Sequence, residues 1–412
     1  MPEASRAPLS WDTPDSPYSW RRLLISLAMS TIGGVGLWSV VVVLPTLQTE
    51  FGVDRGGASM SYMATMVGFA IGGMFMGRLS DRFGVHVPLL IGAVMMGSGY
   101  VAASFASSLW QFIFVQTLFI GMLGSSASFA PLVADITHWF LKRRGIAIAI
   151  VASGNYLSGT LWPPLLNWGM ENYGWRMSYM GVGLFCIATM VPLALMLRRR
   201  PSFDDTAVDA PATSNRYRLD ISPGALQSLL VIAGVACCVA MAMPQVHIVA
   251  YSGDLGYGVA RGTEMLSLML GFGIVSRVVS GMIGDKIGGV ATLILGSFLQ
   301  CAALIFYIPF DGLTSLYIVS ALFGLAQGGI VPSYALIVRE YLPAKEAGSR
   351  VSIVLMATVG GMALGGWLSG EIYDLTGSYK AAFLNGIGWN LLNMSIAFWL
   401  LFGQMKARRL AG

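Results

Sequence analysis

The sequence predicts an all-helical integral membrane protein whose twelve transmembrane helices form two pseudo-symmetric six-helix bundles. Three observations lead to this fold class: an apolar composition, long apolar runs separated by short breaks, and a motif that recurs after half the chain. Of the 412 residues, 55% are hydrophobic and only 11% are charged, and the mean hydropathy is +0.69. Because soluble domains carry about 25% charged residues, this composition excludes a cytosolic enzyme, a nucleic-acid-binding domain and a disordered scaffold.

The apolar runs are long enough to cross a bilayer, and they alternate with breaks that carry charge, glycine or proline. A hydrocarbon core of about 30 Å needs about 20 apolar residues per helix, so the chain has room for on the order of a dozen spans with their loops. In chain order, the expected spans cover residues 22–48, 58–79, 86–106, 109–139, 144–168, 176–197, 224–252, 262–283, 288–309, 312–339, 347–373 and 379–404.

One long polar break divides the chain into halves. It holds three consecutive arginines, four Asp residues and a mixture of Pro, Ala, Thr and Ser, a composition that cannot bury itself. The first apolar run is too long for a signal-peptide core and lacks a small-residue cleavage pattern, so we expect a retained span. The predicted organisation is an N-terminal tail (1–21), a six-helix bundle (22–197), a linker (198–223), a second six-helix bundle (224–404) and a C-terminal tail (405–412).

Basic residues predict the orientation. With a cytoplasmic N-terminus, 20 of the 25 Lys and Arg residues fall in inner segments, four fall in outer ones, and Arg277 is left inside a span. This bias predicts a cytoplasmic-membrane protein with both termini in the cytoplasm. The net charge of +5 therefore has a topological origin and does not indicate a nucleic-acid partner. The four cysteines lie in apolar runs without disulfide or metal-ligand spacing, and we expect no metal and no cofactor.

The two halves share a motif. Gly77-Arg-Leu-Ser-Asp-Arg-Phe-Gly84 follows the second span, and Gly281-Met-Ile-Gly-Asp-Lys-Ile-Gly288 follows the eighth, at a constant offset of 204 residues. A duplicated six-span unit is typical of transporters. Glycines cluster in the spans 58–79 and 347–373, where they predict close helix contacts either within one half or across a mobile interface between the halves.

The motif at 77–84 resembles the loop between spans 2 and 3 in the major facilitator superfamily, and 281–288 is its weaker echo. The segment 139–154, Trp-Phe-Leu-Lys-Arg-Arg-Gly-Ile-Ala-Ile-Ala-Ile-Val-Ala-Ser-Gly, is similar to the start of span 5 in the monocarboxylate transporter family and its oxalate/formate relatives. The run 244–256 and an arginine in span 8 fit the same family. This resemblance implies alternating access, with the two bundles rocking around a central site that moves a small carboxylate, often with a proton.

The resemblance also assigns roles to particular residues. It implies that the span 8 arginine, here Arg277, holds the carboxylate. It implies a gating role at the cytoplasmic face for Asp81, Arg82 and Arg144.

Even apart from the family resemblance, Arg277 is the most informative residue of the sequence. It lies eight residues from Asp285, roughly 12 Å along a helix, and a mid-span charge costs about 2.5–3.5 kcal/mol even on lenient scales. None of the 20 acidic residues falls in the middle of a span, so no protein counter-ion is evident. A guanidinium fork matches a carboxylate, and we therefore expect an anion site here, with Ser276 and Ser280 placed to orient the arginine.

Other candidates are weaker. His247, near the outer end of its span, is either a structural histidine or a second substrate contact and titrating group. Asp135, three residues before His138, is either a local charge pair or a gating or proton-coupling group. Further polar or aromatic candidates for the cavity lie within spans, where a helix–helix hydrogen bond is the alternative: Asn155, Tyr156 and Tyr334.

Two positions depart from animal members of the family. Gly273 stands one helical turn before Arg277, where those members often carry an acid, and the first span has Val40-Val-Val-Val-Leu44 where they carry a lysine. Both residues are implicated in proton coupling in the family. Among internal titratable groups, His247 is the best remaining candidate, and anion exchange competes with proton symport.

We therefore expect a secondary active transporter, not an enzyme, that moves small monocarboxylates such as lactate or pyruvate with a proton. The alternatives are an organic-anion exchanger of the oxalate/formate type and an organic-anion exporter. A membrane enzyme is disfavoured because no His/Asp or acidic cluster lies at one membrane face, and a channel is disfavoured by the repeat around one central charge. The expected partners are the substrate, a proton and the lipid bilayer, with no protein partner evident.

Overall fold

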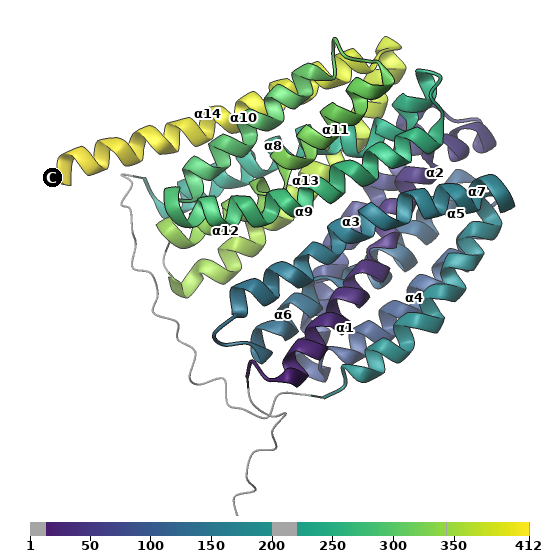
Figure 1. Cartoon of the computed structure of the whole chain (residues 1–412), viewed down its shortest axis with the longest axis horizontal. Coiled ribbons are helices and arrows are strands. Elements are labelled where there is room, and N and C mark those ends of the chain that lie inside the picture. Colours follow the sequence, from purple (N-terminus) through teal and green to yellow (C-terminus); the bar gives the residue numbers. More distant parts are fainter. Residues whose placement is uncertain (1–13, 200–220, 343, 412) are drawn as a thin grey trace, which may run out of the picture.

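The computed structural model describes residues 14–199, 221–342 and 344–411, and this part of the chain is helical without any strand (Figure 1). Most of the predicted linker and of the N-terminal tail lies outside the described residues. The helices are α1 (Pro17–Gly33), α2 (Val35–Phe51), α3 (Arg55–Phe83), α4 (His86–Ser104), α5 (Leu109–Val115), the π-helix η1 (Gln116–Gly124), the 3₁₀-helix η2 (Ser125–Ser128), α6 (Ala130–Trp139), α7 (Arg144–Met196), α8 (Pro223–Asp254), α9 (Val259–Ile287), α10 (Gly289–Phe306), α11 (Leu313–Gln327), α12 (Ile330–Tyr341), α13 (Ala344–Thr376) and α14 (Tyr379–Ala411).

These helices make twelve membrane crossings. Eleven segments of the described chain are long and apolar enough to span a bilayer. One of them, α7, is 53 residues long and consists of two helices that meet at a kink at Gly174 (φ 76°, ψ 160°), so it supplies two crossings. The predicted fold class, twelve helices in two bundles, is confirmed.

Local signals in the sequence explain where several helices begin. Ser16 caps α1 through a bond from the Ser19 amide and is followed by Pro17, whose fixed φ suits the first helical position. Ser222 and Pro223 start α8 in the same way. At both ends of the chain the helices run further than predicted, since α1 begins five residues before the expected span and α14 continues to Ala411.

Two predicted spans are broken helices. The span 109–139 consists of α5, η1, η2 and α6, and the span 312–339 is interrupted at Gly328 and Gly329 between α11 and α12. The breaks at Gly124 and Gly328 are 204 residues apart, the same offset as the repeated motif. The sequence did not predict them, because apolar content records that a segment spans the bilayer and not whether its backbone stays helical. Irregular backbone is tolerated at this depth where protein surrounds it.

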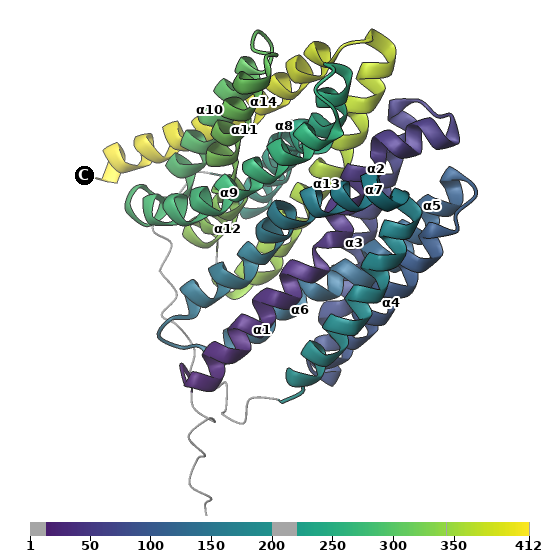
Figure 2. The ribbon, with the colours of Figure 1, turned by 45° about the vertical axis from the view of Figure 1, so that its right-hand side comes forward.

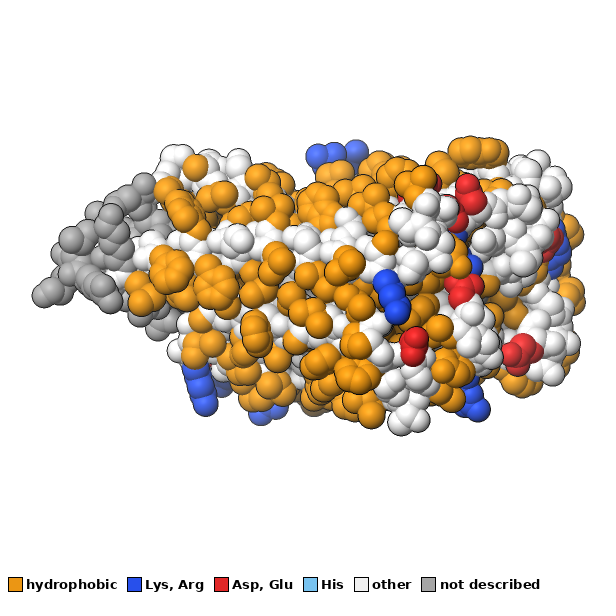
Figure 3. All heavy atoms as spheres, turned by 90° about the horizontal axis from the view of Figure 1, so that it is seen from above, with side chains coloured by type: hydrophobic (Ala, Val, Ile, Leu, Met, Phe, Trp, Pro, Cys, Tyr) orange, Lys and Arg blue, Asp and Glu red, His pale blue; other side chains and the backbone are white. Residues whose placement is uncertain are grey.

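The first half, α1 to α7, lies beside the second half, α8 to α14 (Figures 1 and 2). The helices that meet across the boundary are α3 with α13, α7 with α9, and α2 with α8. The start of α1, the end of α7, the start of α8 and the end of α14 lie at one end of the molecule (Figure 1). We call this end the termini side and the other end the opposite side. On the face seen in Figure 3, hydrophobic side chains are spread over much of the described surface, and acidic ones gather near the opposite side.

The clustered glycines serve both kinds of contact that the sequence left open. A Cβ added at Gly68 or Gly72 would meet η1 of the same half, and the one at Gly72 would lie only 1.9 Å from the Met122 carbonyl oxygen. A Cβ at Gly366 or Gly370 would instead meet Tyr62 or Ser59 of the other half. Gly366 and Gly370 therefore permit the close approach of the two bundles.

Candidate functional site

Arg277 lies on α9 where this helix faces α7 of the other half. Its Nη1 donates a hydrogen bond to the carbonyl oxygen of Ala152 (3.1 Å), and its Nε points to the carbonyl oxygen of Gly328 (3.5 Å) at the break between α11 and α12. Its Cζ lies 4.4 Å from the ring centroid of Tyr156, one helical turn after Ala152. The guanidinium is thus held at the boundary between the halves by two carbonyl groups and an aromatic ring.

None of these three partners carries a negative charge. Arg277 takes part in none of the ion pairs found within the described residues. A guanidinium has five N–H donors, and the hydrogen bonds above use only Nε and one hydrogen on Nη1. In the described part of the chain, Nη2 donates to no protein group, so an edge of the fork is available for a carboxylate.

The ring of Tyr156 occupies the space that a side chain at position 273 would need. This accounts for the glycine at position 273, where animal members of the family often carry an acid. A Cβ built on Gly273 would lie 2.5 Å from Cε1 and 2.7 Å from Cδ1 of Tyr156. Contacts this short require the ring to move. Tyr156 and a side chain at position 273 therefore compete for the same space beside Arg277.

Asn155 and Trp38 lie next to this pair. The Trp38 indole N–H donates to the carbonyl oxygen of Asn155 (3.1 Å), and the Trp38 ring packs against Gly159. The side-chain oxygen of Asn155 is buried and accepts no hydrogen bond from the described residues. A buried acceptor without a partner is costly, so this oxygen is a candidate for contact with a substrate or water.

Ser276 does not orient the arginine in the predicted manner. Its Oγ is buried and has no hydrogen-bond partner among the described residues. The backbone carbonyls and the Tyr156 ring hold Arg277 instead, which the sequence could not indicate because every residue has a carbonyl group.

His247 is buried on α8 and uses both ring nitrogens. Its Nε2 lies 2.7 Å from the carbonyl oxygen of Gly366, and its Nδ1 lies 3.1 Å from the hydroxyl of Tyr379. The partners of the two nitrogens are Gly366 and Tyr379, so no hydrogen bond joins His247 to Arg277 within the described residues.

The Tyr334 hydroxyl also forms its hydrogen bond within the second half. Its hydroxyl donates to the Asn393 side-chain oxygen (2.8 Å), and the Asn393 amide donates to Ser297 Oγ (2.7 Å). These three residues tie α12, α14 and α10 together. Tyr334 therefore contributes to packing of the bundle, and the structure does not join it to Arg277.

Asp135 has a partner that the sequence did not suggest. Arg22, whose side chain is only 1% exposed, donates from Nε and Nη2 to the two carboxylate oxygens at 2.7 and 2.8 Å. Arg22 also donates to the Leu197 carbonyl oxygen (3.0 Å) and lies over the ring of Trp139. The pair joins α1, α6 and the end of α7 within the first half, across 113 residues of sequence.

The three residues assigned to gating by resemblance lie on the termini side. Asp81 is exposed and lines a pocket of about 350 Å³ with Asp135 and His138. Arg82 lies over the ring of Phe83, and the Arg144 Nε donates to the Phe140 carbonyl oxygen (3.2 Å). Their gating role stays a prediction.

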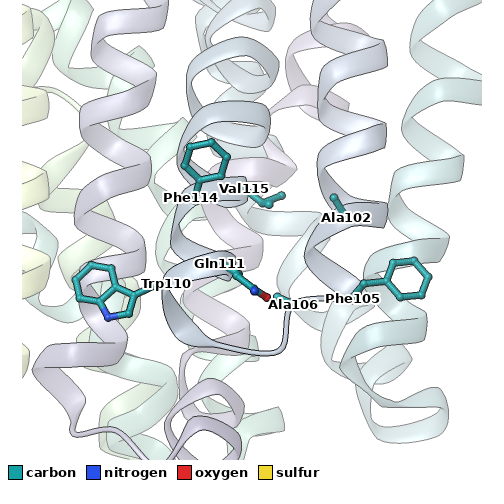
Figure 4. A pocket seen from close by; sticks show the side chains of 7 residues that line it. All are labelled: Ala102, Phe105, Ala106, Trp110, Gln111, Phe114 and Val115. Carbon is teal, nitrogen blue, oxygen red and sulfur yellow. The ribbon is translucent and has the colours of Figure 1, made fainter.

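A different hollow, of about 430 Å³, lies between α4 and α5 (Figure 4). Phe105, Trp110 and Phe114 project from its rim and are more than half exposed. Exposed Trp side chains such as Trp110 are typical of the membrane interface. Because it is lined mainly by apolar groups and holds no charge, it does not suit a carboxylate.

Comparison with known proteins shows which family the chain resembles. The family model described as Major Facilitator Superfamily matches residues 26–315 and 228–410. Monocarboxylate transporter 13 of Rattus norvegicus is 26% identical over 381 residues, covering 90% of this chain and 86% of the relative. The MFS-type transporter pynF of Aspergillus niger is 26% identical over 71% of this chain and 67% of the relative. The agnestins efflux protein AgnL12 of Paecilomyces divaricatus is 21% identical over 83% of this chain and 78% of the relative.

Among solved structures, a bacterial homologue of the human lysosomal transporter Spinster, in an inward-facing and unoccupied conformation, superposes with a TM-score of 0.71. It is 14% identical, and the match covers 95% of this chain and 98% of that one. This similarity shows the fold.

Proposed function

We propose a function from the premise that this chain belongs to the major facilitator superfamily and is a multi-pass membrane transporter. In our proposal it is a secondary active transporter that moves small monocarboxylates, of the size of lactate or pyruvate, by alternating access. Arg277 holds the substrate carboxylate, and Tyr156 and Asn155 lie beside it.

The observation that carries this proposal is the guanidinium of Arg277 at the boundary between the halves, bonded only to carbonyl oxygens among the described residues. A site that is reached alternately from two faces is best placed where both bundles contact it, and Arg277 contacts α7 of one half from α9 of the other. A carboxylate on the free edge of the fork would supply the missing negative charge. The similarity to monocarboxylate transporter 13 supports the same substrate class.

Exchange of organic anions is the second candidate. No carboxylate of the described residues pairs with Arg277, and Tyr156 occupies the space of an acid at position 273. Proton symport would require His247 to titrate while both its nitrogens are engaged. The similarity to an agnestins efflux protein supports outward transport as the physiological direction.

We also propose the orientation. The termini side faces the cytoplasm of a cell whose cytoplasmic membrane holds the protein, because 20 of the 25 Lys and Arg residues lie in segments assigned to that side. The opposite side then faces outward.

Uptake into proteoliposomes tests the proposal. Labelled lactate, pyruvate, oxalate and formate are offered with and without an inward proton gradient, and with empty or substrate-loaded vesicles. Uptake of lactate or pyruvate that depends on the gradient supports symport, and uptake that depends on loading supports exchange. If none of the four acids is transported, the substrate class is wrong.

Arg277→Gln is the decisive variant in this assay. Leaving the substrate charge unpaired costs roughly 2–5 kcal/mol, so we expect transport to fall by about 30-fold or more at low substrate. Arg261→Gln is the matched control, since Arg261 pairs with Glu264 on the surface of the same helix. Native transport by Arg277→Gln would refute the site assignment.

A further inference from the structure

A second inter-bundle cluster, distinct from Arg277, lies on the opposite side of the molecule. Arg55, the first residue of α3, donates from Nη1 and Nη2 to both carboxylate oxygens of Asp254 at 2.5 and 3.1 Å. Asp254 ends α8, so this bidentate ion pair links the two halves. The guanidinium is further fixed by the side chain of Gln48 (3.2 Å) and by the ring of Tyr373, 4.4 Å from Cζ.

A second carboxylate reinforces this link from α13. Asp374 accepts hydrogen bonds from the backbone N–H groups of Arg55 (3.0 Å) and Gly56 (2.5 Å). These N–H groups are at the N-terminus of α3, where amides lack helical partners and the helix dipole favours an anion. Asp374 of the second half therefore binds the N-terminus of α3, which belongs to the first half.

The backbones approach closely directly beside these bonds. A Cβ on Gly370 would lie 3.0 Å from the Arg55 carbonyl oxygen, and a Cβ on Gly366 would lie 2.6 Å from the ring of Tyr62. Such contacts leave no room for a solute between α3 and α13. The polar bonds and the glycine contacts together seal this end of the boundary.

Tyr379 connects the seal to the buried His247. Arg55 Nη1 donates to the Tyr379 oxygen (2.8 Å), and the same hydroxyl lies 3.1 Å from His247 Nδ1. Because the carbonyl oxygen of Gly366 can only accept, His247 Nε2 carries a hydrogen. In neutral His247 the Nδ1 then accepts from the Tyr379 hydroxyl, and the chain of bonds runs unbroken from Asp254 to Gly366.

We propose that Arg55, Asp254 and Asp374, with Tyr379 as the connection to His247, form a gate that closes the opposite side of the transporter. This inference rests on the proposed alternating-access function. A pocket of about 550 Å³, lined in part by Gln48, Arg55 and Asp254, lies over the gate. A solute that arrives from the opposite side meets the ion pair first, and the five bonds from Arg55 and Gly56 to the second half must break before that solute reaches Arg277.

Spin-label distance measurements test the gate without any substrate. Thr49→Cys and Lys380→Cys place labels on exposed residues of the two halves on the opposite side, and the four native cysteines are buried. In the otherwise native protein we expect one short distance. Asp254→Asn should add a population at longer distance, and Asp254→Asn combined with Asp374→Asn should make that population dominant.

Two further variants define the gate. Arg261→Gln removes an ion pair that lies within the second half on the same side, and it should leave the short distance unchanged. Tyr379→Phe removes only the hydroxyl between Arg55 and His247, and it should give a smaller shift than Asp254→Asn. A native distance distribution in Tyr379→Phe would remove His247 from the gate.

A native distribution in the Asp254/Asp374 double variant would overturn the gate itself. Because the measurement uses no substrate, it can fail while Arg277 still binds a carboxylate. It can equally succeed if the transported solute belongs to another class.

Discussion

Tyr156 supplies the surface on which the Arg277 guanidinium lies. A cation over an aromatic face gains about 0.5–2 kcal/mol, and the ring also keeps the guanidinium at the boundary between the halves. We expect Tyr156→Leu to weaken substrate binding by about 2- to 30-fold, from the same interaction energy. Tyr156→Phe, which keeps the ring, should bind as the native protein does.

The two variants are compared by the apparent KM for uptake. A loss in Tyr156→Phe equal to that in Tyr156→Leu would show that the hydroxyl, and not the ring, is what matters.

Asp135 is expected to serve stability more than transport. Removing its charge leaves Arg22 buried and unpaired, which costs about 3–5 kcal/mol for a buried pair. We therefore expect Asp135→Asn to lower the melting temperature in detergent. The control, Glu346→Gln, breaks an exposed i,i+4 pair with Arg350 and should change stability by less than about 1 kcal/mol.

A proton-coupling role for Asp135 makes the reverse prediction. Asp135→Asn would then melt as the native protein does but lose uptake driven by a proton gradient, and this result would contradict the structural role.

At the scale of residues, the sequence predicts charge placement better than contacts. Arg277 stands out because no acid lies near the middle of a span, and the described residues give it no ion pair. The carbonyl oxygens of Ala152 and Gly328 could not be predicted, since a backbone acceptor leaves no trace in residue type. Arg22 and Asp135 each looked like an ordinary inner-end charge, because only the fold brings residues 113 positions apart together.

At the scale of elements, the break between α11 and α12 positions the site. The Gly328 carbonyl oxygen faces Arg277, and a Cβ at Gly328 would lie 2.3 Å from the Gly273 carbonyl oxygen and 2.8 Å from the Arg277 amide nitrogen. Both contacts are with backbone, which cannot swing aside. We expect Gly328→Ala to push α11 away from α9 and to lose substrate binding together with stability.

Gly360→Ala is the control for this prediction. A Cβ there meets nothing within 4 Å, so the variant should bind normally and gain up to about 1 kcal/mol from helix propensity. Melting temperature and substrate affinity are measured for both. Equal behaviour of the two variants would show that the break does not support the site.

The existence of the spans was predictable, and their internal breaks were not. Charged and Gly/Pro breaks place the span boundaries within a few residues, except that helices such as α14 extend beyond the apolar run. The π-helix η1 begins with Gln116 and Thr117 and is otherwise apolar, and two polar residues within a span do not by themselves indicate a change of hydrogen bonding. Glycine clusters predicted close contacts, but only the packing separates Gly72, which faces its own half, from Gly366, which faces the other.

At the scale of the whole molecule, the placement of basic residues predicts the orientation in the membrane. In intact cells, we expect Lys380→Cys to react with a membrane-impermeant maleimide and Arg143→Cys to react only after permeabilisation. Both positions are exposed, and the native cysteines are buried. Labelling of Arg143→Cys alone in intact cells would reverse the assigned orientation.

Arg277 and the Arg55 gate both lie where the two halves of the molecule meet. The two halves touch through α3 and α13 near the opposite side and through α7 and α9 at Arg277. The overall architecture followed from composition and the repeat, because burial of apolar surface in a bilayer leaves few alternatives. The gate could not be predicted in this way. In the sequence, Arg55, Asp254 and Tyr379 lie at separate helix ends, and only the packing of the two bundles brings them together.

The central claim is that Arg277 binds the substrate carboxylate, and equilibrium binding to the purified protein tests it most directly. Labelled lactate and pyruvate are titrated into native protein, Arg277→Lys, Arg277→Gln and the control Arg261→Gln, with folding checked by the melting temperature. We expect native affinity in Arg261→Gln, weaker binding in Arg277→Lys because the fork is lost, and a loss of about 30-fold or more in Arg277→Gln. Native affinity in a folded Arg277→Gln protein would contradict the account.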